Sequence, residues 1–224
     1  PTGPGEGGGG IYNDNPIAVL DFASLYPSSM QERNLSHETI ITEDMIRDNP
    51  ELYVIKDTKK DTECNKSTLF YKGKEFNVTR ITYENYFYKL EGKTWKKHRH
   101  YTKPNITCWF VQDKMGIIPF VVGTLLKKRK ETKNELKIEK NPERKKILDG
   151  KQLSYKLTAN STYGQIGAKT SQLYLQDIAA CTTATGREHI MTAKSFVEDK
   201  FVGSKVVYGD TDSIFVKFDM TKFD

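Results

Sequence analysis

Three carboxylates stand beside apolar runs, and their types and spacing suit metal chemistry. Asp21 closes the run "IAVLDF", which predicts a buried strand, and Asp210 and Asp212 lie between two β-branched runs in "VVYGDTDSIFVKF". In an extended strand, side chains at i and i+2 point to one face. A charge at a buried strand end is costly to desolvate, and a divalent cation removes that cost. The alternative is a plain turn, since Gly-Asp and Asp-Ser pairs are common in turns.

The metal hypothesis implies a particular reaction. Mg²⁺ prefers oxygen ligands and usually takes only one or two carboxylates together with substrate phosphates. Two ions held in this way clamp the attacking and leaving oxygens of an in-line phosphoryl displacement.

A charged stretch near residue 130 predicts a helix with two different faces. Residues 127–146 hold ten basic and four acidic residues, which equals the whole net charge of +6. Cations and carboxylates each repeat every four residues on opposite faces: Arg129, Lys133 and Lys137 against Glu131, Glu135 and Glu139. The basic face could meet phosphates. The alternative is a solvated helix laced with i,i+4 ion pairs.

The stretch "KQLSYKLTANSTYG" predicts a second helix that ends near Gly164. Lys156, Asn160 and Tyr163 fall on one face of it, with Gly164 beside them. A cation, an amide and an aromatic ring could hold a triphosphate, a sugar and a base. The alternative is a polar face toward water with a glycine C-cap.

A basic cluster, "KKHRHYTK" at residues 96–103, is flanked by Trp95 and Tyr101. It could touch a nucleic-acid backbone. A solvated basic loop is the favoured interpretation.

Composition indicates a folded protein without a membrane span. The chain has 224 residues, of which 37% are hydrophobic and 11% aromatic. Three widely spaced cysteines fit neither a disulfide framework nor a zinc site and favour a reducing compartment. The longest apolar run, "IIPFVVGTLL", is too short to cross a bilayer.

The predicted order of elements is typical of an α+β fold. After the first strand, Pro27 marks a turn or the first turn of a helix, and residues 51–112 predict short strands and loops. A helix over residues 120–140 follows, interrupted by Pro142 and again by Gly150. The second helix, a third helical region that tolerates Gly186, and a final hairpin complete the order, which is not repeated βαβ.

Three of these motifs together resemble a known family. "DFASLYPS" from Asp21, "KLTANSTYG" from Lys156 and "YGDTDS" from Tyr208 stand in the order of the three polymerase signatures of family B DNA polymerases. "GIIPFVVGTLLKKRKETK", "TTATGREHI" and "EGGGG" are similar to that family's connecting segments and junction loop. The resemblance covers nearly the whole chain.

The resemblance implies a two-metal nucleotidyl transfer. Asp21 and Asp212 would be the ligands of two Mg²⁺ ions, which Mn²⁺ is able to replace, with the main-chain carbonyl of Phe22 assisting and Asp210 nearby in a less direct role. A primer 3′-hydroxyl would attack the α-phosphorus of a dNTP and release pyrophosphate. The other members of the third motif are Tyr208, Gly209, Thr211 and Ser213.

The resemblance also implies a nucleotide site. Its dNTP-binding side chains would be Arg129, Lys133, Lys156 and Asn160. The backbone amides of Ser24 and Leu25 would meet the phosphate tail, and Tyr26 would lie beneath the sugar and exclude a 2′-hydroxyl. Tyr163 and Gly164 would line the nascent base pair.

The implied architecture is a polymerase palm, an antiparallel sheet backed by helices, with an α-helical hairpin as fingers. Residues 1–18 would be a glycine-rich junction, 19–119 and 169–224 the palm, and 120–168 the fingers. No segment resembles exonuclease or thumb motifs, so we expect a catalytic core cut from a longer polypeptide. We expect primer-template DNA and dNTPs as partners, a processivity factor bound through missing regions, and an intracellular site in a nucleus or at viral replication.

Two alternatives remain open. One is a non-catalytic DNA-binding fragment derived from such a polymerase, which predicts a broken metal site although all three aspartates and Lys156 are present. The other is a fragment that folds but is inactive alone.

Overall fold

The structure is a computed structural model that describes residues 15–57 and 65–222. The chain forms two units. The split unit combines residues up to 26 with those from 185 onward, and the continuous unit holds residues 27–184. Most of the predicted glycine-rich junction lies outside the described residues.

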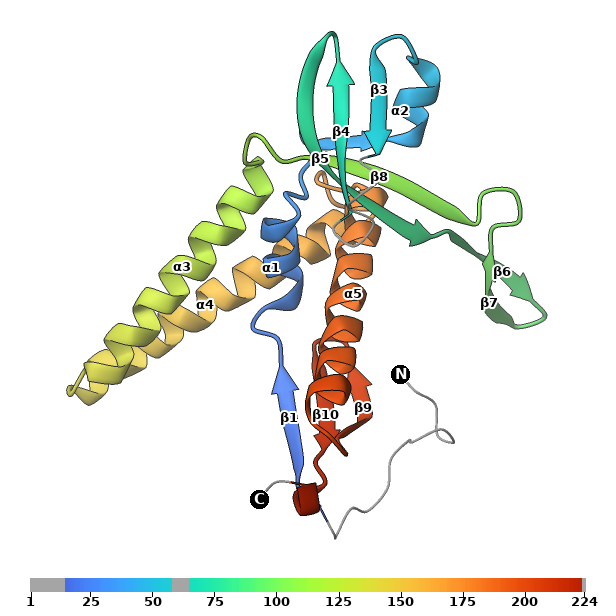
Figure 1. Cartoon of the computed structure of the whole chain (residues 1–224). Coiled ribbons are helices and arrows are strands. Elements are labelled where there is room, and N and C mark those ends of the chain that lie inside the picture. Colours follow the sequence, from blue (N-terminus) through green and yellow to red (C-terminus); the bar gives the residue numbers. More distant parts are fainter. Residues whose placement is uncertain (1–14, 58–64, 223–224) are drawn as a thin grey trace. The chain divides into compact units, whose positions relative to one another are not determined.

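The split unit is built on a three-stranded antiparallel sheet of order β1-β10-β9, which includes the predicted terminal hairpin. Its strands are β1 (Ile17–Asp21), β9 (Lys205–Asp210) and β10 (Ser213–Lys217), followed by the 3₁₀ turn η1 (Met220–Lys222). The second half of helix α5 (Gln176–Lys200) packs on the sheet, where Val197 meets Ile214 and Val216 (Figure 1).

The first strand differs from its expected burial. β1 is an edge strand, and Val19 and Leu20 are 55% and 44% exposed. Its apolar residues fit a buried strand by type, but an edge strand has a partner on one side alone, so the prediction of a buried strand is wrong. Helix α1 (Leu25–Glu32) follows, with Pro27 in its first turn as predicted.

The continuous unit contains a five-stranded antiparallel sheet of order β2-β8-β5-β4-β3. Its strands are β2 (Ile40–Thr42), β3 (Tyr53–Asp57), β4 (Lys66–Tyr71), β5 (Lys74–Glu84) and β8 (Asn105–Val111). A two-stranded sheet, β6 (Tyr86–Glu91) and β7 (Thr94–Arg99), stands between β5 and β8 in the chain, and helix α2 (Glu43–Asp48) follows β2. The expected short strands after residue 51 are confirmed, and the fold is α+β.

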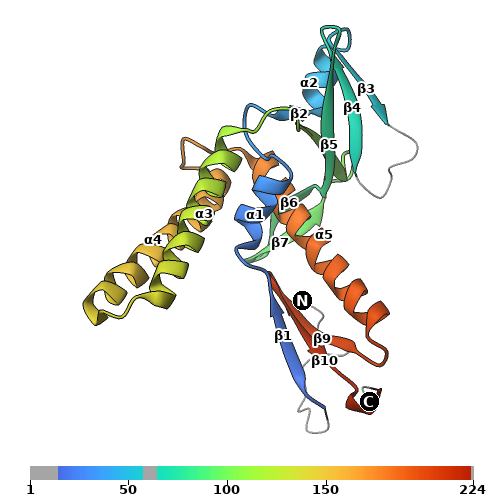
Figure 2. The same cartoon turned by 60° about the vertical axis from the view of Figure 1, so that its left-hand side comes forward.

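Two long helices, α3 (Ile117–Ile138) and α4 (Pro142–Gly167), lie side by side as a hairpin (Figures 1 and 2). The predicted interruption at Pro142 is confirmed, because α3 ends at Ile138 and α4 begins at Pro142, whereas the predicted interruption at Gly150 is wrong. Pro142 is the first residue of α4, where a missing N–H costs nothing, and Asn141 caps the helix by accepting hydrogen bonds from the N–H groups of Glu143 and Arg144. Gly150 lies inside α4.

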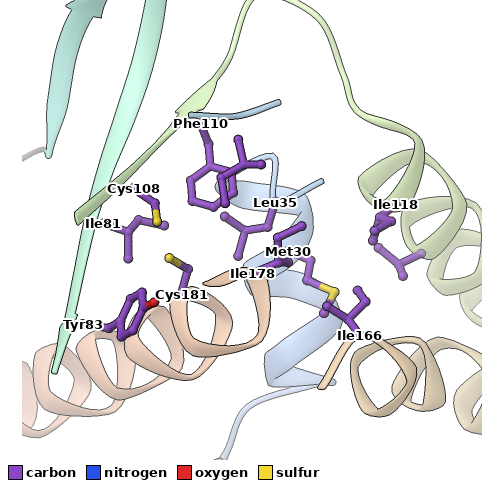
Figure 3. Packing of buried hydrophobic residues seen from close by; sticks show 12 residues of the cluster. Met30, Leu35, Ile81, Tyr83, Cys108, Phe110, Ile118, Ile166, Ile178 and Cys181 are labelled. Atoms are coloured by element: carbon purple, nitrogen blue, oxygen red, sulfur yellow. The ribbon is translucent and has the colours of Figure 1, made fainter. Parts of the chain in front are cut away.

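The main core of the continuous unit joins its sheet to its helices. Phe110 and Cys108 of β8 and Ile81 of β5 meet Met30 and Leu35 from α1 and the segment after it (Figure 3). The first half of α5 contributes Ile178 and Cys181, and α3 and α4 contribute Ile118, Val122 and Ile166. Apolar contact at this density holds the helical hairpin against the sheet.

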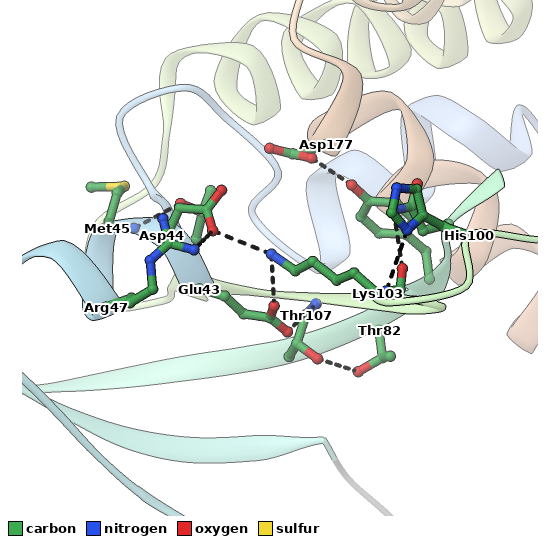
Figure 4. Close-up of polar contacts among 12 residues, drawn as sticks. Glu43, Asp44, Met45, Arg47, Thr82, His100, Lys103, Thr107 and Asp177 are labelled. Atoms are coloured by element: carbon green, nitrogen blue, oxygen red, sulfur yellow. Dashed lines mark hydrogen bonds and ion pairs between the residues drawn. The ribbon is translucent and has the colours of Figure 1, made fainter. Parts of the chain in front are cut away.

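Polar contacts fasten the ends of these strands. Lys103 Nζ lies 3.1 Å from Glu43 Oε2 and 3.2 Å from Asp44 Oδ1, which ties α2 to the segment before β8 (Figure 4). The Tyr83 hydroxyl donates to the Asp177 carboxylate at the start of α5. Burial, and then this hydrogen bond, raise the pKa of Tyr83 above its ordinary value.

Candidate active site

The end of β1 and the turn of the terminal hairpin meet through the backbone. Asp21 pairs with Ser213 across the sheet, and the Phe22 N–H donates to the Asp212 carbonyl at 2.7 Å. The first and third sequence motifs, far apart in the chain, therefore adjoin at one end of a single sheet.

The turn itself departs from the expected geometry. Asp210 ends β9 and pairs with Ser213, and Thr211 between the two aspartates has φ 45°, in the left-handed region. The Thr211 hydroxyl donates to Asp210 Oδ1 at 3.1 Å. The i,i+2 rule for strands does not apply across such a turn, so the expectation of two carboxylates on one strand face is wrong.

The carboxylates are also less buried than the sequence suggested. Asp21 and Asp210 are exposed and Asp212 is half-buried. The desolvation argument for a cation therefore fails, because water reaches these groups. In the part of the chain that the structure describes, no group of three or more His, Cys, Asp or Glu side chains is arranged to hold a metal ion.

The donor set still has the composition that Mg²⁺ uses. Asp21 and Asp212 supply two carboxylates, and Phe22 between strand and helix supplies a main-chain carbonyl. Such an ion commonly takes one or two carboxylates and completes its shell with water and substrate phosphates. Two carboxylates at adjoining backbone positions match this coordination pattern. The lack of a third carboxylate beside them is therefore compatible with Mg²⁺ binding.

The link from β1 to α1 carries a second strained residue. Ser24 has φ 56°, a conformation that costs a non-glycine residue energy. Leu25 begins α1 directly after it, so the amides of Ser24 and Leu25 stand at a helix N-terminus, where backbone N–H groups and the helix dipole favour anions.

Tyr26 lies in the electrostatic field of the aspartates. Its pKa is raised by burial and then by the negative charge of Asp212, while Arg187 acts in the opposite direction. A Cβ on Gly186 would lie 3.3 Å from Tyr26 Cε1 and 3.2 Å from Leu25 Cδ2. The tyrosine ring therefore rests against α5 at a residue without a side chain.

Sequence reasoning missed Gly186 and Arg187 as members of this site. The segment "TTATGREHI" was noted as a family-like connection, and its glycine only as tolerated in a helix. A glycine followed by an arginine inside an otherwise regular helix is the signal that could have found them. His189, two residues after Arg187, has its ring centroid 6.2 Å from that of Phe22.

The remaining members of the third motif have structural positions. The Ser213 hydroxyl donates to the Asp210 carbonyl at 3.3 Å. Tyr208, 39% exposed, packs edge-on against Phe215 with ring centroids 5.3 Å apart. Gly209 lies opposite Ile214, and a Cβ on it would meet the Ser213 carbonyl at an ordinary 3.6 Å.

The predicted nucleotide-binding side chains lie on α3 and α4 of the continuous unit. Arg129 Nε donates to Gln152 Oε1 at 3.5 Å, across the helical hairpin. Gln152, Lys156 and Asn160 are spaced by four residues and therefore lie along one face of α4. Arg129 contacts the first residue of this row, Gln152, on the face that also holds Lys156 and Asn160. Lys133, Lys156 and Asn160 are exposed.

The aromatic end of this row is partly enclosed. Tyr163 packs against the main core. Apart from its chain neighbours and the adjacent backbone of its own helix, a Cβ on Gly164 would find no heavy atom of the described chain within 4 Å, so the surface there is open. Gly164 does not end α4 as a C-cap would, because the helix continues to Gly167.

Comparison with known proteins identifies relatives along nearly the whole chain. The model of the family described as DNA polymerase family B matches residues 7–224. A DNA polymerase of Pyramimonas orientalis virus is 37% identical over 226 residues, covering 93% of this chain and 19% of that protein. The DNA polymerase delta catalytic subunit of Drosophila melanogaster is 33% identical over 219 residues, covering 93% of this chain and 16% of that protein.

A shorter match is closer. A DNA polymerase of Acanthamoeba polyphaga mimivirus is 57% identical over 96 residues, which is 43% of this chain and 6% of that protein. The chain thus spans about a fifth of the length of these relatives or less. Among the described helices, none has the length and apolar character that crossing a membrane requires.

Proposed function

Because the chain belongs to DNA polymerase family B, we propose that it forms the catalytic core of a DNA-directed DNA polymerase. The reaction is transfer of a deoxynucleotide from a dNTP to a primer 3′-hydroxyl, with release of pyrophosphate. The junction of β1 with the β9–β10 turn supports this most, since the Phe22 to Asp212 hydrogen bond sets two aspartates from distant motifs at one sheet end.

The metal ligands in this proposal are Asp21, Asp212 and the Phe22 carbonyl. Two Mg²⁺ ions, or Mn²⁺ in their place, would neutralise the phosphates and lower the pKa of the primer hydroxyl. Asp210 holds the turn through the Thr211 hydroxyl and acts on the site through its charge. The fixed backbone at Thr211 positions Asp212 before substrate arrives, which reduces the ordering cost of the transition state.

The incoming nucleotide is bound by residues of the family motifs. The amides of Ser24 and Leu25 meet its phosphate tail, and Arg129, Lys133, Lys156 and Asn160 bind the triphosphate. Tyr163 and Gly164 line the base pair, where the open surface at Gly164 leaves room for a base. These roles follow the family motifs residue by residue.

The subdomains follow the same assignment. Residues 19–119 and 169–224 form the palm, 120–168 the fingers, and 1–18 a junction segment. Primer-template DNA and dNTPs are the partners, and a processivity factor binds through other parts of the polymerase. The site of action is a nucleus or a viral replication site within a cell.

Primer extension distinguishes this proposal from a DNA-binding fragment without catalysis. We expect a polypeptide that contains this chain to extend a primed template with dNTPs and Mg²⁺, and to stop when a chelator removes the metal. The chain of 224 residues is tested beside it. Template binding without extension in the longer polypeptide would favour the non-catalytic alternative.

Tyr26 is expected to exclude ribonucleotides. Replacing Tyr26 with alanine removes the ring beside α5 and should relax discrimination against ribonucleotides by about a hundredfold, the scale on which an apolar pocket rejects one added hydroxyl. Tyr26→Phe keeps the ring and should keep the discrimination. The ratio of kcat/KM for dNTP and rNTP measures both, and unaltered discrimination in Tyr26→Ala would remove this role.

A further inference from the structure

The two-stranded sheet β6–β7 is a hairpin that extends the long strands β5 and β8 (Figure 1). Its base is fixed by the backbone around Asn85. The Asn85 N–H donates to the Pro104 carbonyl at 2.8 Å, and the His100 N–H donates to the Asn85 carbonyl at 2.9 Å. The hairpin is therefore firmly attached within the continuous unit.

Strand register sorts its side chains into two faces, because directly paired residues of an antiparallel ladder point the same way. The pairs Tyr86 with Arg99, Tyr88 with Lys97, and Leu90 with Trp95 alternate with the other three pairs. We name the first set the aromatic face: Tyr86, Tyr88, Leu90, Trp95, Lys97 and Arg99. The second set is the opposite face: Phe87, Lys89, Glu91, Thr94, Lys96 and His98.

The aromatic face presents rings and cations to solvent. Tyr88 is 63% exposed and Trp95 is 68% exposed. Lys97 Nζ lies 3.7 Å from the centre of the Tyr86 ring, so a cation sits among the rings. Exposed large aromatic side chains gathered on one surface mark an interaction site more often than a solvated strand.

Both faces of the hairpin carry ion pairs. On the opposite face, Glu91 pairs with Lys96 at 2.9 Å and with His98 at 3.0 Å, and Phe87 stacks on His98. At the base of the aromatic face, Arg99 Nη2 lies 3.7 Å from Glu84 Oε1, and the Tyr86 hydroxyl donates to Glu84 Oε2. Lys97 and Arg99 outnumber this one carboxylate, so the aromatic face keeps a positive charge among its rings.

A hollow at the base of the hairpin adds to the cationic surface. Its volume is about 450 Å³, and its lining residues are Lys97, His98, Arg99, His100, Tyr101 and Pro104. Both cations of the aromatic face, Lys97 and Arg99, line it together with His98 of the opposite face. Such a hollow suits a phosphate group beside the stacking rings.

We propose that the aromatic face binds single-stranded DNA. Unpaired bases stack on Trp95 and Tyr88, while Lys97 and Arg99 meet the phosphates. Alternating rings and cations are what single strands require, because each base offers a flat π-face and each linkage a negative charge. In duplex DNA the base faces are already stacked on one another, so a duplex would contact the cations of this face but not its rings.

This inference goes beyond the proposed catalytic function. The hairpin contains none of the three polymerase motifs, and stacking needs neither metal ions nor dNTPs. A chain with Asp212→Asn is expected to bind single strands through the hairpin unchanged. Failure of the hairpin proposal is therefore separable from failure of the catalytic one.

The experiment is a titration of the 224-residue chain with a fluorescein-labelled oligothymidylate, followed by anisotropy. Trp95→Ala should weaken binding about tenfold, the effect of losing one base stack. Lys97→Glu should weaken binding and lower the slope of log affinity against log salt by about 0.7 for the lost phosphate contact.

Lys89→Glu is the matched control, since it makes the same charge change on the opposite face of the same hairpin. It should leave at least half of the affinity. The chain has two tryptophans, so the fluorescence of Trp95 can be measured alone in a Trp109→Phe variant. Binding of the single strand should quench the Trp95 fluorescence.

Several results would overturn the proposal. They are equal losses in Lys97→Glu and Lys89→Glu, tighter binding of a duplex of the same length, or no quenching of Trp95. A dimer in sedimentation that Trp95→Ala dissolves would instead assign the face to a second copy of the chain.

Discussion

Replacing Asp212 with asparagine should abolish most nucleotidyl transfer while leaving the fold intact. The loss expected for Asp212→Asn, and likewise for Asp21→Asn, is about a thousandfold in kcat, since a bound metal supplies several kcal/mol of charge stabilisation. Asparagine keeps the size of the side chain, and the Phe22 hydrogen bond uses the Asp212 main-chain carbonyl, which the substitution does not touch. Single-turnover primer extension in a polymerase that contains this chain measures the loss.

A binding measurement shows whether the loss arises from the metal. Free Mn²⁺ counted by electron paramagnetic resonance should show weaker binding to the 224-residue chain with either substitution. Asp199→Asn is the control, because Asp199 is exposed on α5 in the same unit and no ligand role falls to it. If Mn²⁺ affinity stays the same in all three variants, the ligand assignment of Asp21 and Asp212 is wrong.

Phe110→Ala is expected to cost about 3–5 kcal/mol of unfolding free energy in the continuous unit. Phe110 is 0% exposed and packs among residues of β5, α1 and α5, so the cavity left by its ring cannot collapse without moving several elements. Urea unfolding followed by the fluorescence of the neighbouring Trp109 measures the change.

Phe120→Ala makes the same chemical change on the surface. Phe120 of α3 is 62% exposed, so its removal should alter stability by about 0.5 kcal/mol or less. Comparable losses in the two variants would contradict the packing described for the β8 core.

The helices and the terminal hairpin could be predicted from the sequence because their signals are local. The four-residue charge repeat of α3 and the β-branched runs around the terminal aspartates need no knowledge of distant contacts. The break at Pro142 could also be predicted, because a proline rarely continues a helix. The second helix was expected only after Gly150, whereas Pro142 itself begins α4 under the cap formed by Asn141.

Burial and side-chain direction at the site could not be predicted in the same way. "IAVLDF" has the composition of a central strand, but β1 has one neighbour, and sheet position depends on residues nearly the whole chain away. The same-face expectation for Asp210 and Asp212 failed because Thr211 adopts a left-handed turn. The motifs could still be recognised, because their order in the chain does not depend on those details, and the structure brings the first and third together at one end of a sheet.

The pairing of β1 with β10 has a consequence for synthesis on the ribosome. β10 is made about 190 residues after β1, which at ~5–20 residues per second is an interval of about 10–40 s. During that time the apolar strand with Val19 and Leu20 lacks its native partner and could pair with another chain. Asp21 at the end of β1 places a charge beside this apolar segment, and charged residues in such positions generally oppose aggregation.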